Sequence, residues 1–277
     1  MVTAQKLVTV ATDRESGVAV LTLNRAEKKN ALSRTLLSQL LEAIHEVRDD
    51  DDINCVVLEA AGDSFSSGQD LHDLRKDWTE GARKKSRWNE HNGSTMAVVK
   101  LLRDSRQVTI AAVNGYCLGG GMVLMNACDL AFAADNAKIG MPEVLRGSYG
   151  RSATPTLFLS RIPLKTAFFI QLTGRNLTGI EAARVGLVCQ SVPADQLKAH
   201  VMEIAREIAS RNPVTLEHAK IAAYTQIDLP FDLAVKADDA IGHRMRYYVD
   251  PLSDVDDYLA SQKGGTNLGY RAKLKSK

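Results

Sequence analysis

Cysteine, aromatic side chains and net charge are all scarce in this sequence. Its 277 residues include four cysteines, 5% aromatic residues and a formal net charge of +2. The cysteines stand far apart and mostly within apolar stretches, which argues against a disulfide framework and predicts buried free thiols at Cys55, Cys117, Cys128 and Cys189. Because the charge is nearly balanced, the chain has no overall field that would favour nucleic acid or a membrane surface as its partner.

Several motifs of well-known sites are also missing. The sequence has no C-x-x-C and no H-E-x-x-H, and its six histidines are scattered, so we expect no metal site. It has no G-x-S-x-G, which disfavours a nucleophilic serine, and neither of the glycine motifs typical of dinucleotide and P-loop sites. The segment Met1–Arg14 carries neither a secretory nor a transit pattern, and we therefore expect a cytoplasmic protein.

Hydrophobic periodicity alternates between strands and helices through the first part of the chain. Apolar runs predict strands over 7–11, 18–24, 54–60, 108–113 and 129–134. Spaced leucines after the N-cap candidate Ser33 predict a helix that extends to Val47. The charged segment 70–92 is expected to form a helix and a loop over a site. From Leu157 onward the pattern predicts helix almost throughout.

The order of these elements predicts an α/β fold. Repeated strand and helix units followed by a helical tail indicate parallel strands that are buried on both faces. No clean linker interrupts the chain, so residues 1–195 are expected to form a core with the site, and residues 196–277 a helical extension of the same structural unit. Polar residues and three consecutive glycines break the long apolar segment 108–134, which predicts a strand, a turn, a helix and a strand in place of a membrane span.

Two loop segments carry groups suited to binding. The segment Asn24–Leu32 contains the adjacent Lys28 and Lys29, which can reach a phosphate as flexible point charges; the alternative is a solvated turn. The segment Ser64–Leu71 is rich in serine and glycine, which lets the backbone turn sharply and present an N–H group outward. Each segment follows a predicted strand, so each is a candidate for a ligand contact.

A glycine cluster and one glutamate are the sharper chemical features. The cluster Gly119–Gly121 stands between a predicted buried strand and a helix, where free N–H groups at the helix N-terminus favour a carbonyl that becomes an oxyanion. Glu143 suits a proton shuttle, because a raised pKa is predicted from its apolar neighbours Ile139, Met141, Val144 and Leu145. The alternative is a surface glutamate paired with Arg146.

Taken together, these segments resemble the enoyl-CoA hydratase/isomerase family, the crotonases, with some likeness to the hydroxycinnamoyl-CoA hydratase-lyase branch. The resemblance covers nearly the whole chain and rests on the order and spacing of Asn24–Leu32, Phe65–Leu71, Asn114–Gly121, Cys128–Leu130, Met141–Glu143, Leu172–Gly174 and Ala182–Val188. It implies a core built as a spiral of ββα turns, a C-terminal helical part used in trimer formation, and an acyl-CoA thioester as substrate. Coenzyme A is then part of the substrate, and no separate cofactor is expected.

The resemblance also implies roles for particular residues. The backbone N–H groups of Gln69 and Gly120 correspond to an oxyanion hole, and Glu143 corresponds to a catalytic acid/base. Lys263 near the carboxyl terminus is a candidate contact to CoA across a subunit boundary, and a homotrimer or a dimer of trimers is expected. The remaining CoA contacts are implied at Lys28 and at the backbone of Ala31, Ser67 and Leu71.

The sequence departs from the family pattern at one catalytic position. Hydratases of the family carry two glutamates that hold and deliver a water, whereas Val123 stands at the first of these positions and Glu143 at the second. The glycine-rich stretch that usually follows is replaced by residues 148–154. We therefore expect chemistry that one carboxylate can support, namely hydration, double-bond isomerisation or hydratase-lyase cleavage of an enoyl-CoA. Candidates for an added polar partner are Tyr116, Asn126, Tyr149 and Arg151.

Two other functions are kept as alternatives. A catalytically reduced homologue would bind CoA or RNA, the latter through the basic run Arg83–Lys85 with Arg87 and Trp88. Such a charge run is more often a solvated face, so a nucleic-acid partner is not the first expectation. An acyl-CoA or β-diketone hydrolase would use His72 as a base near the oxyanion segment.

Overall fold

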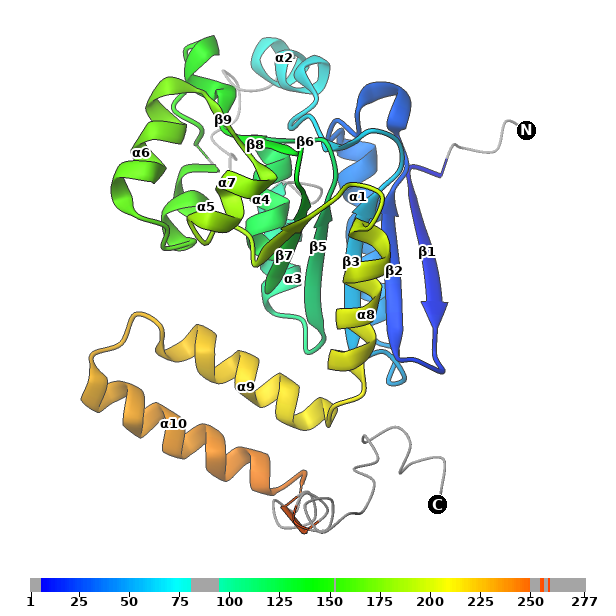
Figure 1. Ribbon diagram of the computed structural model, residues 1–277, viewed down its shortest axis with the longest axis vertical. Coiled ribbons are helices and arrows are strands. Elements are labelled where there is room, and N and C mark those ends of the chain that lie inside the picture. The colour runs from blue at the N-terminus through cyan, green and yellow to red at the C-terminus, as the bar shows by residue number, and fades with distance from the viewer. Residues whose placement is uncertain (1–5, 81–94, 152, 250–254, 257–258, 260–277) are drawn as a thin grey trace.

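The strands form two sheets that lie side by side (Figure 1). A computed structural model describes residues 6–80, 95–151, 153–249, 255–256 and 259. The larger sheet has the order β1 (Val8–Asp13), β2 (Val18–Leu23), β3 (Cys55–Ala60), β5 (Val108–Val113), β7 (Leu130–Ala134) and β10 (Gln190–Val192). The smaller sheet has the order β4 (Ser64–Ser66), β6 (Tyr116–Leu118), β8 (Lys138–Gly140) and β9 (Asn176–Thr178).

Each turn of the chain contributes one strand to each sheet. The chain passes from β3 to β4, from β5 to β6 and from β7 to β8, and each new strand pairs in parallel with its predecessor in the same sheet. In the larger sheet Cys55 lies opposite Val108, and Ile110 lies opposite Leu130. The β1–β2 and β8–β9 pairs are antiparallel. This arrangement confirms the predicted α/β fold with a ββα spiral.

Helices cover both faces of the larger sheet and continue to the C-terminal end of the described chain. In Figure 1, α8 crosses in front of the sheet, where it packs on β2, β3, β5 and β7, while α1 and α3 lie behind it. The helical elements are η1 (Ala26–Lys28), α1 (Arg34–Arg48), α2 (Leu71–Glu80), α3 (Thr95–Arg103), α4 (Gly120–Ala127), η2 (Pro142–Arg146), α5 (Ala153–Leu159), α6 (Leu164–Thr173), α7 (Gly179–Arg184), α8 (Leu197–Ala209), α9 (Pro213–Gln226) and α10 (Phe231–Arg246). No helix within the described ranges is long and apolar enough to cross a lipid bilayer.

Helix α1 shows why the local signals in the sequence succeed. The side-chain oxygen of Ser33 accepts a hydrogen bond from the N–H of Leu36 at 3.2 Å, so the predicted N-cap is confirmed. The buried side chains recur at helical spacing and turn one face to the core. They are Leu36, Leu37, Leu40, Ala43, Ile44 and Val47.

Two expectations about the chain are wrong in part. The region after Leu157 contains the strands β9 and β10, each three residues long, which pair with β8 and β7 at sheet edges. Such short strands depend on a partner strand and leave almost no periodicity in the sequence. Cys189 is exposed, whereas the other three cysteines are buried free thiols as expected.

The C-terminal hairpin of α9 and α10 projects from the body of the molecule (Figure 1). A buried polar joint attaches α9 to the core: Lys220 Nζ lies 2.8 Å from Asp129 Oδ2 and donates to the carbonyl oxygen of Gln107 at 2.9 Å. The hydroxyl of Tyr224 donates to Asp129 Oδ1 at 2.8 Å. The side chains of Lys220 and Asp129 are 7% and 14% exposed, so solvent does little to replace either partner.

We expect Lys220→Met to lower the free energy of unfolding by about 3–5 kcal/mol, because it leaves the buried Asp129 carboxylate without its counter-ion. Urea unfolding of the purified protein measures the change. Lys198→Met is the matched control, since Lys198 is 73% exposed beside Glu59 and its ion pair is expected to contribute less than about 1 kcal/mol. If the two variants lost the same free energy of unfolding, the Lys220–Asp129 ion pair would not be what holds α9 to the core.

Candidate functional site

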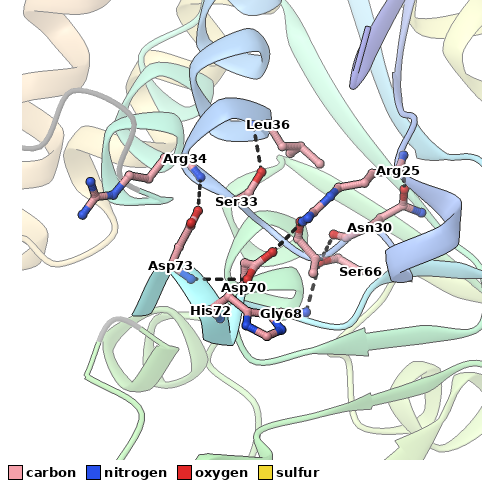
Figure 2. Close-up of polar contacts among 11 residues, drawn as sticks. Arg25, Asn30, Ser33, Arg34, Leu36, Ser66, Gly68, Asp70, His72 and Asp73 are labelled. Carbon is pink, nitrogen blue, oxygen red and sulfur yellow. Dashed lines mark hydrogen bonds and ion pairs between the residues drawn. The ribbon is translucent and has the colours of Figure 1, made fainter. Parts of the chain in front are cut away.

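The segment Asn24–Leu32 is fastened to the segment that leads into α2 (Figure 2). Asn30 is fully buried and has a positive φ of 51°, which places its amide between the two segments. Its Oδ1 accepts from the N–H of Arg25 at 2.8 Å, and its Nδ2 donates to the carbonyl oxygens of Ala61 and Ser64 at 2.9 and 2.7 Å. The two loop segments singled out in the sequence therefore form one unit.

The backbone of Leu32 binds the residues on both sides of Gln69, and the backbone N–H of Gln69 donates to none of the described residues. The N–H of Leu32 donates to the carbonyl oxygen of Gly68 at 2.8 Å, and the N–H of Asp70 donates to the carbonyl oxygen of Leu32 at 3.1 Å. Leu32 and Gln69 thus form a parallel bridge in which the N–H of Gln69 points away from Leu32. Among the described residues, this N–H donates no hydrogen bond.

The N–H group of Gly120, at the start of α4, also donates no hydrogen bond to the described residues. Gly119 precedes the helix with φ of 49° and ψ of −111°, a conformation that favours glycine. Gly120 is the first residue of the helix, so its N–H has no acceptor within the helix. A Cβ atom built on Gly120 would lie 3.3 Å from the nitrogen of Gln69. The backbone of Gly120 therefore lies next to the N–H group of Gln69.

The carboxyl group of Glu143 lies against the same glycine turn. A Cβ atom built on Gly119 would lie 2.2 Å from Glu143 Oε1 and 3.2 Å from Cδ. Glu143 Oε2 is buried and has no hydrogen-bond partner within the part of the chain that is described. Burial raises the pKa of the Glu143 carboxyl, while its own backbone N–H and the Arg146 guanidinium lower it by less. Gln69, Gly120 and Glu143 are thus brought together.

The apolar setting of Glu143 differs in detail from the expectation. Ile139 and Met141 are buried, but Val144 and Leu145 are 39% and 70% exposed and do little to exclude water. These two side chains point outward because Glu143 sits in the short helix η2, where successive residues face different directions. Burial still raises the pKa of the carboxyl, because the glycine turn covers it on one side.

Val123 is a buried apolar residue of α4, close to the glycine turn. It lies one turn into α4, where its N–H donates to the carbonyl oxygen of Gly119 at 3.0 Å, and its side chain is 1% exposed. The charged group that shifts the pKa of Glu143 is a guanidinium, and none of the described carboxylates contributes. One turn further along α4, the Nδ2 of Asn126 is buried and has no partner among the described residues.

The other candidate polar partners are placed differently. Tyr116 carries the ammonium groups of Lys29 and Lys138 over its ring, at 4.6 and 5.1 Å from the centroid. Tyr149 is 66% exposed. Of the polar candidates, Asn126 is the one whose side chain has a buried hydrogen-bonding atom without a partner in the described chain.

The implied CoA-binding positions lie in the two loop segments, close to η1 and to the start of α2. Lys28 is exposed and lines a surface pocket of about 570 Å³ together with Asp70 and His72. The N–H groups of Ala31 and Ser67 donate to the carbonyl oxygens of Lys28 and Lys29 at 3.0 and 2.9 Å, and Leu71 is half exposed. Glu143 does not line this pocket. The basic run 83–88 and Lys263 lie outside the described residues.

Two charged residues that sequence reasoning missed lie at the centre of this region. Arg25 Nη1 lies 2.7 Å from Asp70 Oδ2, and the two side chains are 18% and 10% exposed (Figure 2). Burial raises the pKa of the Asp70 carboxyl, but hydrogen bonds from Arg25 and from the N–H groups of His72 and Asp73 outweigh it, and the pKa lies below its usual value. The one feature of the sequence that could have indicated this pair is that Arg25 and Asp70 each stand in a loop segment predicted to contact a ligand.

The side chains of the described residues include no group of three or more histidines, cysteines, aspartates or glutamates arranged to hold a metal ion.

Comparisons of the sequence and the fold with known proteins point to one family. The profile described as Enoyl-CoA hydratase/isomerase matches residues 13–245. The chain is 34% identical over 220 residues to a hydroxycinnamoyl-CoA hydratase-lyase of Pseudomonas fluorescens, covering 76% of each protein. It is 33% identical to a short-chain-enoyl-CoA hydratase of Clostridium acetobutylicum, covering 82% of this chain and 85% of that one. A crystal structure of an enoyl-CoA hydratase of Mycobacterium smegmatis superimposes with a TM-score of 0.85 at 26% identity, covering 93% of this chain and 97% of that one.

Proposed function

The chain belongs to the enoyl-CoA hydratase/isomerase family, and from that premise we propose that it converts an enoyl-CoA thioester by proton transfer through Glu143 alone. As a family member it is an acyl-CoA enzyme of the lyase or isomerase class. The observation that carries the proposal is the Glu143 carboxyl against Gly119, beside two unused N–H groups and without a second described carboxylate.

The N–H groups of Gln69 and Gly120 polarise the thioester carbonyl. Negative charge develops on the thioester oxygen when a proton is removed from the acyl chain or when a nucleophile adds to carbon 3. Donors that are already oriented toward that oxygen stabilise the charge without reorganisation, and each is worth roughly 2.7–4 kcal/mol in other oxyanion holes. The adjacent positions of the two nitrogens support this role.

Glu143 moves the proton in each of the three candidate reactions. In isomerisation its carboxylate removes a proton from carbon 4 and returns it to carbon 2. In hydration it removes a proton from water as the oxygen adds to carbon 3, and then protonates carbon 2. In the lyase step it removes the proton of a 3-hydroxyl group as the bond between carbons 2 and 3 breaks, and then protonates carbon 2. All three begin with the ionised carboxylate acting as a base.

The remaining site residues bind the CoA part of the substrate. Lys28 is an exposed cation at the end of η1, and a flexible ammonium group suits a phosphate. We place further CoA contacts at the backbone of Ala31, Ser67 and Leu71. Coenzyme A enters as part of the thioester, so the proposal includes no separate cofactor, and it assigns the enzyme to acyl-CoA metabolism such as that of fatty acids, in the cytoplasm.

We also propose that the C-terminal hairpin assembles the enzyme into a homotrimer or a dimer of trimers. Helix α10 has no buried residue, and Phe231, Leu233 and Val235 are 80%, 51% and 44% exposed. Burying such side chains between subunits removes apolar surface from water.

Direct mass spectrometry of a panel of enoyl-CoA esters tests the proposed function. At least one ester is expected to gain one water, to change retention without a change of mass, or to release a shortened CoA ester. The free acids of the same panel serve as controls and should not react, because they lack the thioester that the N–H groups polarise. A panel that binds but never reacts would favour a second candidate, a catalytically reduced CoA-binding homologue, for which the buried Val123 is the supporting observation.

A further inference from the structure

Asp70 makes hydrogen bonds to Leu32, to the start of α2 and to Arg25; Figure 2 shows those made by its side chain. Its N–H donates to the carbonyl oxygen of Leu32, which fixes the backbone directly after Gln69. Its Oδ1 accepts from the N–H of His72 at 2.9 Å and so caps the start of α2. Its Oδ2 accepts from Arg25 Nη1 at 2.7 Å.

Arg25 carries this connection into the turn that holds Lys28. The same Nη1 atom donates to the carbonyl oxygen of Ala31 at 2.9 Å, and the backbone N–H of Arg25 donates to Asn30 Oδ1. The guanidinium therefore fixes both the turn from Arg25 to Ala31 and the carboxylate that follows Gln69. Arg25 and Asp70 are separated by 45 residues, so the contact is set by the fold alone.

The backbone on the other side of Gln69 is held to the same turn. The hydroxyl of Ser66 donates to the carbonyl oxygen of Asn30 at 2.8 Å and accepts from the N–H of Gly68 at 3.1 Å. The peptide units before and after Gln69 are thus both tied to the turn, while the Gln69 N–H is left unused. A donor oriented in this way cannot rotate freely to follow a misplaced oxygen.

We propose that Arg25 and Asp70 are positioning residues, whose ion pair holds the Gln69 N–H in line with the thioester oxygen and couples it to the CoA-binding turn. The inference rests on the proposed function, because it takes Gln69 to be an oxyanion donor. Neither side chain touches the reacting atoms. An ion pair that is at most 18% exposed suits this role, because a partly desolvated, charge-assisted hydrogen bond resists displacement by water.

Asp70→Asn is the sharpest variant, because it keeps the shape and the oxygen that caps α2 while it removes the charge facing Arg25. We expect kcat to fall about 10–100-fold, because a displacement of about 1 Å at a reacting group can cost about 100-fold. Binding of free CoA is expected to weaken less than kcat falls, because Arg25 still donates to the carbonyl oxygen of Ala31 and so holds the CoA-binding turn. Asp195→Asn is the control, since it makes the same chemical change at an exposed residue that does not line the pocket containing Lys28 and Asp70. Its kcat should equal that of the unmodified enzyme.

A vibrational measurement separates positioning from stability. The carbonyl stretching frequency of a bound, unreactive acyl-CoA thioester reports the polarisation by Gln69 and Gly120, and unfolded molecules do not contribute to it. We expect a downshift in the unmodified enzyme, a smaller one in Asp70→Asn, and no further reduction in the Arg25→Met, Asp70→Asn double variant. Arg25→Lys, which keeps the charge, should restore part of the downshift lost in Arg25→Met.

The outcomes distinguish two failures. If the unmodified enzyme produces no downshift, the oxyanion role fails and the proposed function falls with it. If the unmodified enzyme produces the downshift and Asp70→Asn matches it in frequency and in kcat, the proposed function survives and the positioning role of Arg25 and Asp70 is overturned. Losses in the two single variants that multiply in the double variant would also overturn the coupling.

Discussion

Glu143→Gln is expected to lower kcat by about 10²–10⁴-fold, the range that a positioned general acid or base contributes. The amide keeps the shape of the side chain against Gly119 but cannot accept the proton. Val123 is apolar, and none of the described carboxylates shifts the pKa of Glu143, so we expect no described neighbour to take over. The dissociation constant for free CoA should change little, because Glu143 does not line the pocket that contains Lys28. Steady-state kinetics and CoA titration of the purified variant measure the two effects.

The exposed Glu46 on α1 supplies the control for this substitution. Glu46→Gln makes the same chemical change on the surface and should leave kcat and CoA binding as they are. A Glu143→Gln enzyme that turns over like the Glu46→Gln control would remove Glu143 from the proton-transfer step. A loss of CoA binding together with turnover would instead assign Glu143 a role in holding the substrate.

Gly119→Ala is expected to lower kcat by about 10²-fold or more, since a displacement of about 1 Å at a reacting group can cost that much. The new Cβ atom would lie 2.2 Å from Glu143 Oε1, a distance that forces the carboxyl or the glycine turn to move. Moving the turn also shifts the N–H of Gly120, the next residue. One methyl group therefore disturbs the proton shuttle and the oxyanion donor together, and steady-state kinetics on the reacting ester measures the result.

Gly186→Ala is the control for backbone strain without a collision. Gly186 has φ of 77°, comparable with 49° at Gly119, but a Cβ atom there meets nothing within 4 Å. This variant should lose about 1 kcal/mol of stability and keep its kcat. If Gly119→Ala keeps full kcat, the Glu143 carboxyl does not lie against Gly119 during turnover; if both variants lose kcat equally, strain and not collision is responsible.

Elements with strong local signals could be predicted from the sequence. Strand β5 occupies Val108–Val113 as predicted, and α1 begins after the Ser33 cap, because apolar spacing and capping are encoded by neighbouring residues. Strands β9 and β10 could not be predicted in this way. Each is three residues long and forms because a strand distant in sequence offers hydrogen bonds.

The candidate site divides along the same line. Gly120 and Glu143 could be singled out because a glycine cluster before a helix and a glutamate in an apolar run are local patterns. The Arg25–Asp70 pair could not, since its partners are 45 residues apart and each resembles an ordinary loop charge. The exposure of Leu145 was likewise hidden, because it follows from the direction of one residue in η2.

The dependence of kcat/KM on pH tests the single-carboxylate account most directly, because it reports the ionisation of the free enzyme. Burial raises the pKa of Glu143 above the value of about 4.3 that is usual for glutamate. As the pH falls, this carboxylate therefore gains its proton, and stops acting as a base, at a higher pH than an ordinary glutamate does. The account predicts a single acid limb of unit slope in log kcat/KM, with an apparent pKa above about 4.3. It also predicts that the residual activity of Glu143→Gln lacks this limb. A slope of two, or a limb that survives in Glu143→Gln, would contradict it.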